Sequence, residues 1–155
     1  MSARDLIVRL IQHHLWAQER VLRGLEAMEV APAEALRLFN HIHAADRTWL
    51  TRLEGSDTTT ALWSEEAALA GLRRELENLK PAWQAVIDTL TEARLEQVLT
   101  YGNAQGVIFS NNIADILTHV TNHASYHRAQ VARIIREAGG EPVNTGFIGF
   151  AREGH

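Results

Sequence analysis

Residues 113–135 read IADILTHVTNHASYHRAQVARII, and this stretch decides the fold. Its apolar residues recur three and four positions apart, which places them on one face of an amphipathic helix. Asn111 or Asn112 can cap the start of this helix, and Gly139 with Gly140 can end it. The stretch therefore predicts a long helix with one face buried in a core.

Two more long helices are predicted in the first third of the chain. The apolar residues of 6–28 recur at helical spacing, and Ser2 can cap the start of that helix. Pro32 suits the first position of the second helix, because its missing N–H has no partner there. The apolar face of this second helix continues until Gly55.

Residues 56–60 are polar and predict a loop, followed by another long helix. The hydroxyl of Ser64 can cap this helix, and the two acidic residues that follow suit the positive end of its dipole. We expect the helix to extend to about Leu90. Pro81 predicts a kink or a short break near Leu79, because a proline inside a helix removes one hydrogen bond.

The segment 95–110 differs in character, since two short apolar runs flank the glycine-bounded turn 102–106. It predicts a hairpin-like extended segment before the last long helix. The tail 142–155 carries apolar residues and is expected to fold back. Four long amphipathic helices bury their apolar faces most simply against one another, so the fold class is all-α, a four-helix bundle. The length predicts one domain over 1–155.

Composition excludes several classes of function. The net charge of −4 provides no general basic field, which argues against nucleic acid and anionic lipid as partners. The chain has no apolar run of the ~18 residues that cross a bilayer. It contains no Cys, which excludes disulfides, a thiolate nucleophile and Cys-ligated zinc. The polar N-terminus lacks the plan of a secretion signal, so we expect a cytoplasmic protein.

Histidine is the unusual residue type, with eight in the chain. Most of them fall in three short clusters: His13 and His14; His41 and His43; His119, His123 and His127. His123 and His127 are about 40° apart around the helix axis and one turn apart along it, so both can point at one ion. We expect His127 inside the buried face and His123 beside it. Such an inward pair is a recurring half-site for zinc and related ions.

The third ligand stays open on spacing alone. On the second helix, His41 lies about 110° from the centre of the apolar face and His43 about 90°, on opposite sides, so the angles do not separate them. The first helix offers His13 and His14 as further candidates. His119 lies roughly 12 Å from His127 along the axis, so the two cannot share an ion, and His119 is instead a candidate to orient the site or contact substrate.

Structural interpretations compete with these functional ones. A pair of His four residues apart on a helix is more often structural than metal-binding, and both interpretations stay open on the pattern alone. The four Trp, at positions 16, 49, 63 and 83, favour packing over a substrate cage. Asp46 and Asp115 are possible partners of ligand His, although exposed carboxylates are the more usual interpretation. Asp46 and His43 are also candidates for a general base.

Residues 40–50 (NHIHAADRTWL) and 119–130 (HVTNHASYHRAQ) resemble the two signature helices of the DinB-like family, also called DinB/YfiT-like metalloenzymes. The similarity extends over nearly the whole chain. It implies a four-helix bundle with a long crossover, a homodimer, and a divalent metal held by three His. Matched residue by residue, the resemblance implies His41, His123 and His127 as ligands. The family often has Gly where this chain has Ala129.

The family includes thiol-dependent S-transferases and a mycothiol-dependent isomerase, and its name records induction by DNA damage. The resemblance therefore implies an enzyme in which Zn²⁺ or Ni²⁺ activates a thiol or water for transfer to, or hydrolysis of, a small-molecule substrate. A chain without Cys would take a low-molecular-weight thiol as cosubstrate. The catalytic candidates are His43, Asp46 and His119. The rival hypothesis is a stress-associated, non-catalytic bundle with a vestigial metal site.

Overall fold

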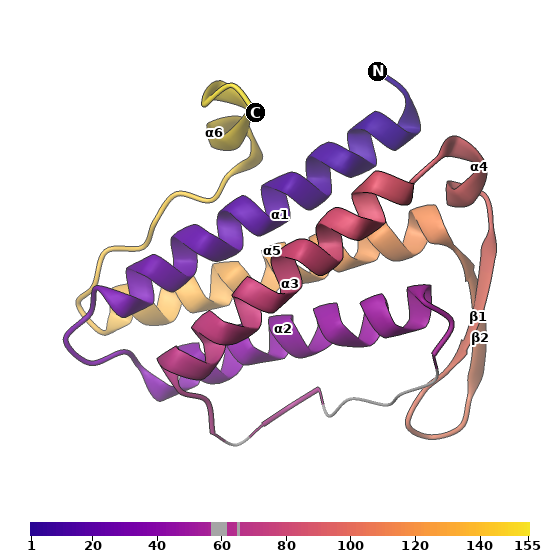
Figure 1. Ribbon diagram of the computed structural model, residues 1–155. Helices are drawn as coiled ribbons and strands as arrows, with labels where there is room; N and C mark the ends of the chain where they lie inside the picture. The colour runs from indigo at the N-terminus through magenta and orange to yellow at the C-terminus, as the bar shows by residue number, and fades with distance from the viewer. Residues whose placement is uncertain (57–61, 65) are drawn as a thin grey trace.

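The computed structural model describes residues 1–56, 62–64 and 66–155. Within these ranges the protein is an all-α bundle with one small two-stranded sheet, as predicted (Figure 1). The elements in chain order are α1 (Ala3–Glu26), α2 (Ala33–Leu53), α3 (Leu69–Thr89), α4 (Glu92–Leu95), β1 (Val98–Gly102), β2 (Ile108–Asn112), α5 (Ile113–Glu137) and α6 (Phe147–Arg152). Among the described residues, every helix is too short or too polar to serve as a membrane span.

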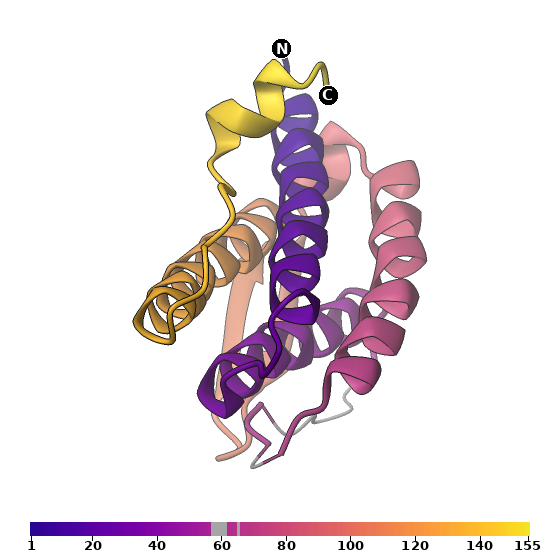
Figure 2. The ribbon, with the colours of Figure 1, turned by 90° about the vertical axis from the view of Figure 1, so that its left-hand side faces the viewer.

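The four long helices pack in a ring, and helices consecutive in the chain are not always neighbours. α1 packs against α3 and α5, and α2 packs against the same two helices. Figure 2 shows α1 between α5 and α3. The segment 90–112, which holds α4 and the hairpin, carries the chain from α3 across the bundle to α5, as a long crossover requires.

The predicted caps of two helices are confirmed. The Ser2 hydroxyl accepts a hydrogen bond from the Asp5 backbone N–H, and the Asp5 carboxylate accepts one from the Ser2 backbone nitrogen. The Asn112 side chain accepts a hydrogen bond of 2.7 Å from the Asp115 backbone N–H at the start of α5. Gly139 follows the last turn of α5 with φ of 84°, a conformation that favours glycine.

The start of α3 differs from the prediction. The Ser64 hydroxyl donates to the Glu66 carbonyl at 2.7 Å, so it does not cap a helix, and α3 begins four residues later than expected, after Ala68. Most of the predicted loop 56–60 and the first acidic residue of the predicted helix lie outside the described residues. The helix continues through Pro81 without the break that we considered.

Two smaller differences concern the helix boundaries. Pro32 has the extended ψ of 130° and caps α2, so it lies one position before the predicted first helical residue. The short helix α4, which is capped by the Thr91 hydroxyl, has no counterpart in the prediction. Four residues are too few to produce the repeating apolar spacing that identifies a helix.

The predicted hairpin forms and packs on the bundle, and the tail folds back as expected. β1 and β2 pair antiparallel, with Tyr101 opposite Phe109. The Trp49 ring contacts Tyr101 edge-on with ring centroids 5.1 Å apart, which joins α2 to the hairpin. The tail folds back onto α1 through α6, where Phe150 is buried against the His13 ring.

The core consists of two apolar clusters separated by a polar layer. On α1 the first cluster ends at Ile11 and the second begins at Val21. Buried polar residues lie between them on α1, and a second set occupies α2 and α5. These buried polar residues are His13, His14, Gln18, His41, His43, Asp46, Thr48, Thr121 and Arg128. The polar layer places the candidate site near the middle of the bundle.

Candidate metal centre

Three His side chains converge where α2 packs against α5. His41 comes from α2, and His123 and His127 come from successive turns of α5. One ring nitrogen from each of the three lies within 4.8 Å of the other two. The ring centroids are 4.9 Å apart for His41 and His123, and 4.6 Å apart for His123 and His127. The structure therefore brings together the three ligands that the resemblance implied.

Hydrogen bonds orient two of the three imidazoles. His41 Nδ1 lies 2.7 Å from the Leu62 carbonyl oxygen, and His127 Nδ1 lies 2.7 Å from Gln130 Oε1. Because both oxygens only accept, each Nδ1 carries the hydrogen and donates it. The lone pair of each ring therefore lies on Nε2, the nitrogen left free for a metal.

The distances and charges of the cluster suit a divalent ion. His41 Nε2 and His123 Nε2 are 3.0 Å apart. Two nitrogens bound to one zinc ion at about 2.0 to 2.1 Å lie about 3 Å apart, so the rings need little movement to share an ion. Burial and the neighbouring imidazoles lower the pKa of His123 to about 4, and burial lowers the pKa of His41. Both rings are therefore neutral near pH 7, as ligation requires.

Trp63 packs directly on one ligand. Its ring stacks on the His41 ring with centroids 3.7 Å apart and an interplanar angle of 6°. The guanidinium carbon of Arg37 lies 5.0 Å from the centre of the Trp63 ring. Trp83 is fully buried in the core, as the packing interpretation expects, whereas 48% of Trp63 is exposed. Trp63 therefore forms part of the wall of the site.

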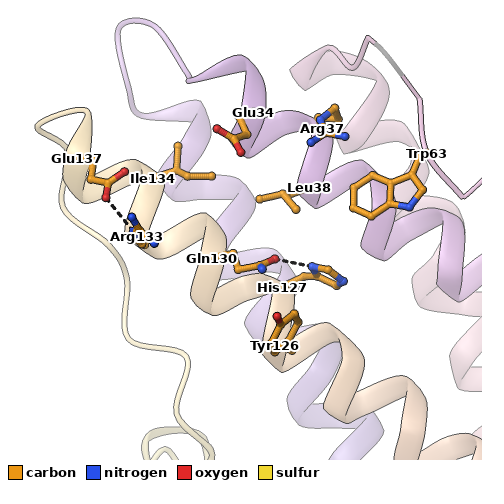
Figure 3. A pocket seen from close by; sticks show the side chains of 10 residues that line it. All are labelled: Glu34, Arg37, Leu38, Trp63, Tyr126, His127, Gln130, Arg133, Ile134 and Glu137. Carbon is orange, nitrogen blue, oxygen red and sulfur yellow. Dashed lines mark hydrogen bonds and ion pairs between the residues drawn. The ribbon is translucent and has the colours of Figure 1, made fainter.

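A cavity of about 530 Å³ opens beside His127 (Figure 3). One wall comes from α2 and Trp63, and the other comes from α5. Its lining residues are Glu34, Arg37, Leu38, Trp63, Tyr126, His127, Gln130, Arg133, Ile134 and Glu137. The cavity gives a small molecule direct access to one of the three imidazoles.

The model of the DinB family matches residues 9–153. The chain belongs to the DinB family. The protein called DinB from Bacillus subtilis is 21% identical over 150 residues, which cover 87% of this chain and 87% of that protein. The resemblance inferred from residues 40–50 and 119–130 is thus confirmed.

The other His of this DinB-family chain lie outside the three-ligand cluster. His13 Nε2 lies 2.7 Å from the Thr145 carbonyl oxygen, and His14 Nε2 lies 3.0 Å from Asp46 Oδ2. His43 is fully buried against Phe39, and neither of its ring nitrogens has a hydrogen-bond partner among the described residues. Burial lowers the pKa of His43 to about 4, so this ring is neutral near pH 7.

The three catalytic candidates have different surroundings. Asp46 is 2% exposed and bonds His14, so the expectation of an exposed carboxylate is wrong. His119 is exposed, and its ring centroid lies 5.7 Å from that of His123. A second cavity of about 380 Å³ is lined by His119 together with Trp49, Tyr101, Asn111, Asp115 and Ile116. The His119 side chain therefore lines this cavity and also contacts His123, one of the three candidate metal ligands.

Arg128 is a site residue that sequence reasoning missed. It is 3% exposed, and its Nη1 lies 3.1 Å from His14 Nδ1. Nη1 also donates to Gln18 Oε1 at 3.2 Å, and Nη2 donates to Ser125 Oγ at 3.0 Å. Burial lowers the pKa of Arg128 to about 10, and the charge of Asp46 opposes this shift. The guanidinium therefore stays charged at pH 7 inside the bundle.

The buried face of α5 centres near Ala124 and includes Arg128 on one side. Its buried residues are Ile113, Ile116, Leu117, Val120, Thr121, Ala124, Arg128, Val131 and Ile135. His127 and Ile134 are half-buried towards the other side of this face, so His127 is less enclosed than the expectation of a fully inward position had it. Arg128 lies four residues after Ala124 and three before Val131, and this spacing was the available signal.

Proposed function

We propose that the protein is a metal-dependent enzyme in which His41, His123 and His127 hold Zn²⁺ or Ni²⁺. The reaction is transfer of a thiol to a small-molecule substrate, or hydrolysis of that substrate. The observation that carries the proposal is the convergence of three imidazoles beside an open cavity. Family membership supports the metal centre, because a metal-binding bundle is what the resemblance implied.

A divalent ion at this centre would lower the pKa of a thiol or a water and so supply a nucleophile near neutral pH. The chain's own residues prepare the place for it. The Leu62 carbonyl and the Gln130 side chain hold two rings with Nε2 free. Trp63 covers one face of the His41 ring and keeps water from it. Because the chain has no Cys, the thiol is a low-molecular-weight cosubstrate.

We assign proton transfer to His119 among the three catalytic candidates. Its exposed ring lines the second cavity beside His123, where it can receive a proton from a reacting group and pass it to solvent. His43 and Asp46 are enclosed in the core, and Asp46 already accepts a hydrogen bond from His14. These two residues are better placed to support the bundle than to exchange protons with a substrate.

The deciding experiment is metal analysis of protein purified without an affinity nickel column. We expect close to one equivalent of zinc or nickel in the wild type and much less in His127→Ala. His155→Ala is the matched control, because His155 lies at the exposed C-terminus away from the cluster. Equal metal content in the wild type and His127→Ala would end the proposal.

The second candidate function is a non-catalytic bundle with a vestigial metal site, and the enclosure of His43 and Asp46 favours it. Conjugation of thiols to electrophiles, with and without metal, separates the two functions. Metal-dependent turnover excludes the inert bundle. Metal-dependent turnover in assays without thiol would instead support hydrolysis.

We further propose that the protein acts in the cytoplasm as a homodimer, as the family resemblance implies. Light scattering coupled to size-exclusion chromatography tests the assembly. A mass near twice the 17.3 kDa of one chain supports the dimer, and a mass near one chain at micromolar concentration contradicts it.

A further inference from the structure

Arg37 carries an unbalanced positive charge in the cavity beside His127. In the part of the chain that the structure describes, no carboxylate lies within ion-pair distance of its guanidinium, which instead packs on the Trp63 ring. The other arginine in this cavity, Arg133, donates to Glu137 at 2.8 Å. The two cavity arginines therefore differ in what they can still bind.

Arg37 lies on the side of the cavity nearest the metal centre. Its guanidinium carbon is 5.0 Å from the Trp63 ring centre, and the His127 ring centre is 6.1 Å from the same point. The same Trp63 ring stacks on the His41 ring with centroids 3.7 Å apart, so the Arg37 guanidinium lies near two of the three candidate ligands. Figure 3 shows Arg37 between Glu34 and Trp63 on the α2 wall, opposite His127.

The remaining charges of the cavity lie farther from the ligands. Arg37 is one helical turn before His41, whereas Glu34 is two turns before it. Arg133 and Glu137 are about two and three turns after His127. Imidazole ligands bring no negative charge, so they leave the charge of a bound divalent ion uncompensated. The inner end of the cavity therefore has a positive potential from two sources, Arg37 and the ion.

We propose that this cavity binds a small anionic molecule whose carboxylate, or an equivalent acidic group, pairs with Arg37 while its other end faces His127. This inference rests on the proposed function, in which that molecule is the thiol cosubstrate. Pairing of its acidic group with Arg37 makes the site prefer it over neutral thiols. Arg37 and His127 both lie close to the Trp63 ring, so a ligand with only a few bonds between its two ends can reach both residues. Leu38 and Ile134 supply apolar contacts for that chain.

The test uses two thiols that differ only in their end group, 3-mercaptopropionate and 3-mercapto-1-propanol. Each is titrated into the Co²⁺-loaded protein, and the sulfur-to-cobalt charge-transfer absorbance gives its Kd. We expect the acid to bind about tenfold more tightly than the alcohol, as a charge-assisted pair with arginine provides. Arg37→Gln should remove this preference, and Arg37→Lys should restore part of it.

Arg133→Gln is the matched control, because it removes a cavity charge that Glu137 already balances. It should leave the ratio of the two Kd values within about twofold of the wild type. An equal ratio in the wild type and Arg37→Gln overturns the inference while leaving the proposed function intact.

Failure of the proposed function gives a different result, because then neither thiol produces a charge-transfer band on the Co²⁺-loaded protein. In that case calorimetry with succinate decides the inference alone. Binding to the wild type that Arg37→Gln weakens about tenfold supports an anion site at Arg37. Absent or unchanged binding overturns it.

Discussion

Two hydrogen bonds determine the tautomer of His14. Arginine has no acceptor, so His14 Nδ1 accepts from Arg128, and the hydrogen on Nε2 is donated to Asp46. A neutral imidazole thereby joins a buried cation to a buried anion. Burying the Arg128 and Asp46 charges without hydrogen-bond partners would be costly, and the His14 ring provides a hydrogen bond to each of them.

Glu19 should make the free energy of unfolding depend on acid pH. Burial acts to raise its pKa, but hydrogen bonds from Arg73, Lys80 and Arg23 outweigh burial and lower the pKa to about 2. Because the folded pKa is depressed below the ordinary value of 4.5, the stabilisation is complete above about pH 4.5 and is lost as the pH falls towards 2.

We therefore expect Glu19→Gln to reduce the free energy of unfolding by about 1–2 kcal/mol at pH 7 and by almost nothing near pH 2. Urea denaturation across this range measures the difference. Glu137→Gln, which removes an exposed ion pair with Arg133, should cost less than about 0.5 kcal/mol at any pH. A cost for Glu19→Gln that does not change with pH would contradict the assignment.

At the scale of elements, the His14 bridge joins three helices. His14 lies on α1, Asp46 on α2, and Arg128 on α5 directly after the candidate ligand His127. The bridge therefore holds α2 and α5 at the relative height at which His41 and His127 meet. Apolar contacts are not directional, so apolar packing alone would fix the relative height of the two helices less strictly than these hydrogen bonds do.

Arg128→Met should destabilise the protein by about 3–5 kcal/mol, because Asp46 is left as an uncompensated buried charge. The double variant Arg128→Met with Asp46→Leu should recover much of this loss, since it removes both charges. Urea denaturation of the metal-free protein provides the comparison. If the double variant were less stable than either single variant, the two charges would not be coupled as described.

Pro81→Ala should stabilise α3. Pro81 is exposed in the middle of this 21-residue helix and cannot donate to the carbonyl of Glu77 one turn earlier. Alanine restores that donor, and we expect a gain of about 1–3 kcal/mol, reduced by the greater freedom of the unfolded chain. Thermal unfolding followed by circular dichroism measures it. A lower melting temperature for Pro81→Ala would show that the proline is accommodated without cost.

Local chemistry decided which elements could be predicted. Asn112 and Gly139 act within one turn of α5, so their residue types sufficed to place both ends. Ser64 has the same capping chemistry, but its hydroxyl donates to a nearby carbonyl, and competition between local hydrogen bonds is not visible in the sequence. The burial of Arg128 depends on partners that α1 supplies from more than a hundred residues away.

The candidate metal ligands also differ in how far the sequence could predict them. The spacing of His123 and His127 on one helix predicted their convergence directly. The choice between His41 and His43 depends on how α2 is rotated against α5, and helical angles leave that rotation open. The resemblance selected His41, and in the structure His43 instead faces Phe39 in the core.

At the scale of the whole molecule, the candidate metal centre joins two helices that are far apart in the chain. One ligand comes from the second helix and two come from the last long helix, which are 82 residues apart at the closest pair. An ion that binds only the folded arrangement stabilises the entire bundle, by about 4 kcal/mol at a thousand times its Kd. For a chain of this size that corresponds to roughly 10 °C in Tm.

We therefore expect Zn²⁺ or Ni²⁺ to raise the Tm of chelator-treated wild-type protein by about 10 °C. The double variant His123→Ala with His127→Ala should keep its helicity and show no such rise. Differential scanning calorimetry gives the Tm, and far-ultraviolet circular dichroism gives the helicity. A rise of equal size in the double variant would place the stabilising ion elsewhere.

The stack of Trp63 on His41 gives the chain a built-in optical reporter. An indole in contact with a ligand ring loses emission when an open-shell ion such as Ni²⁺ arrives, and keeps it with closed-shell Zn²⁺. Titration with Ni²⁺ should thus quench the fluorescence and titration with Zn²⁺ should not, and Trp63→Phe should abolish the quenching while the remaining indoles still emit. The occupancy of the centre can then be followed in solution by light alone.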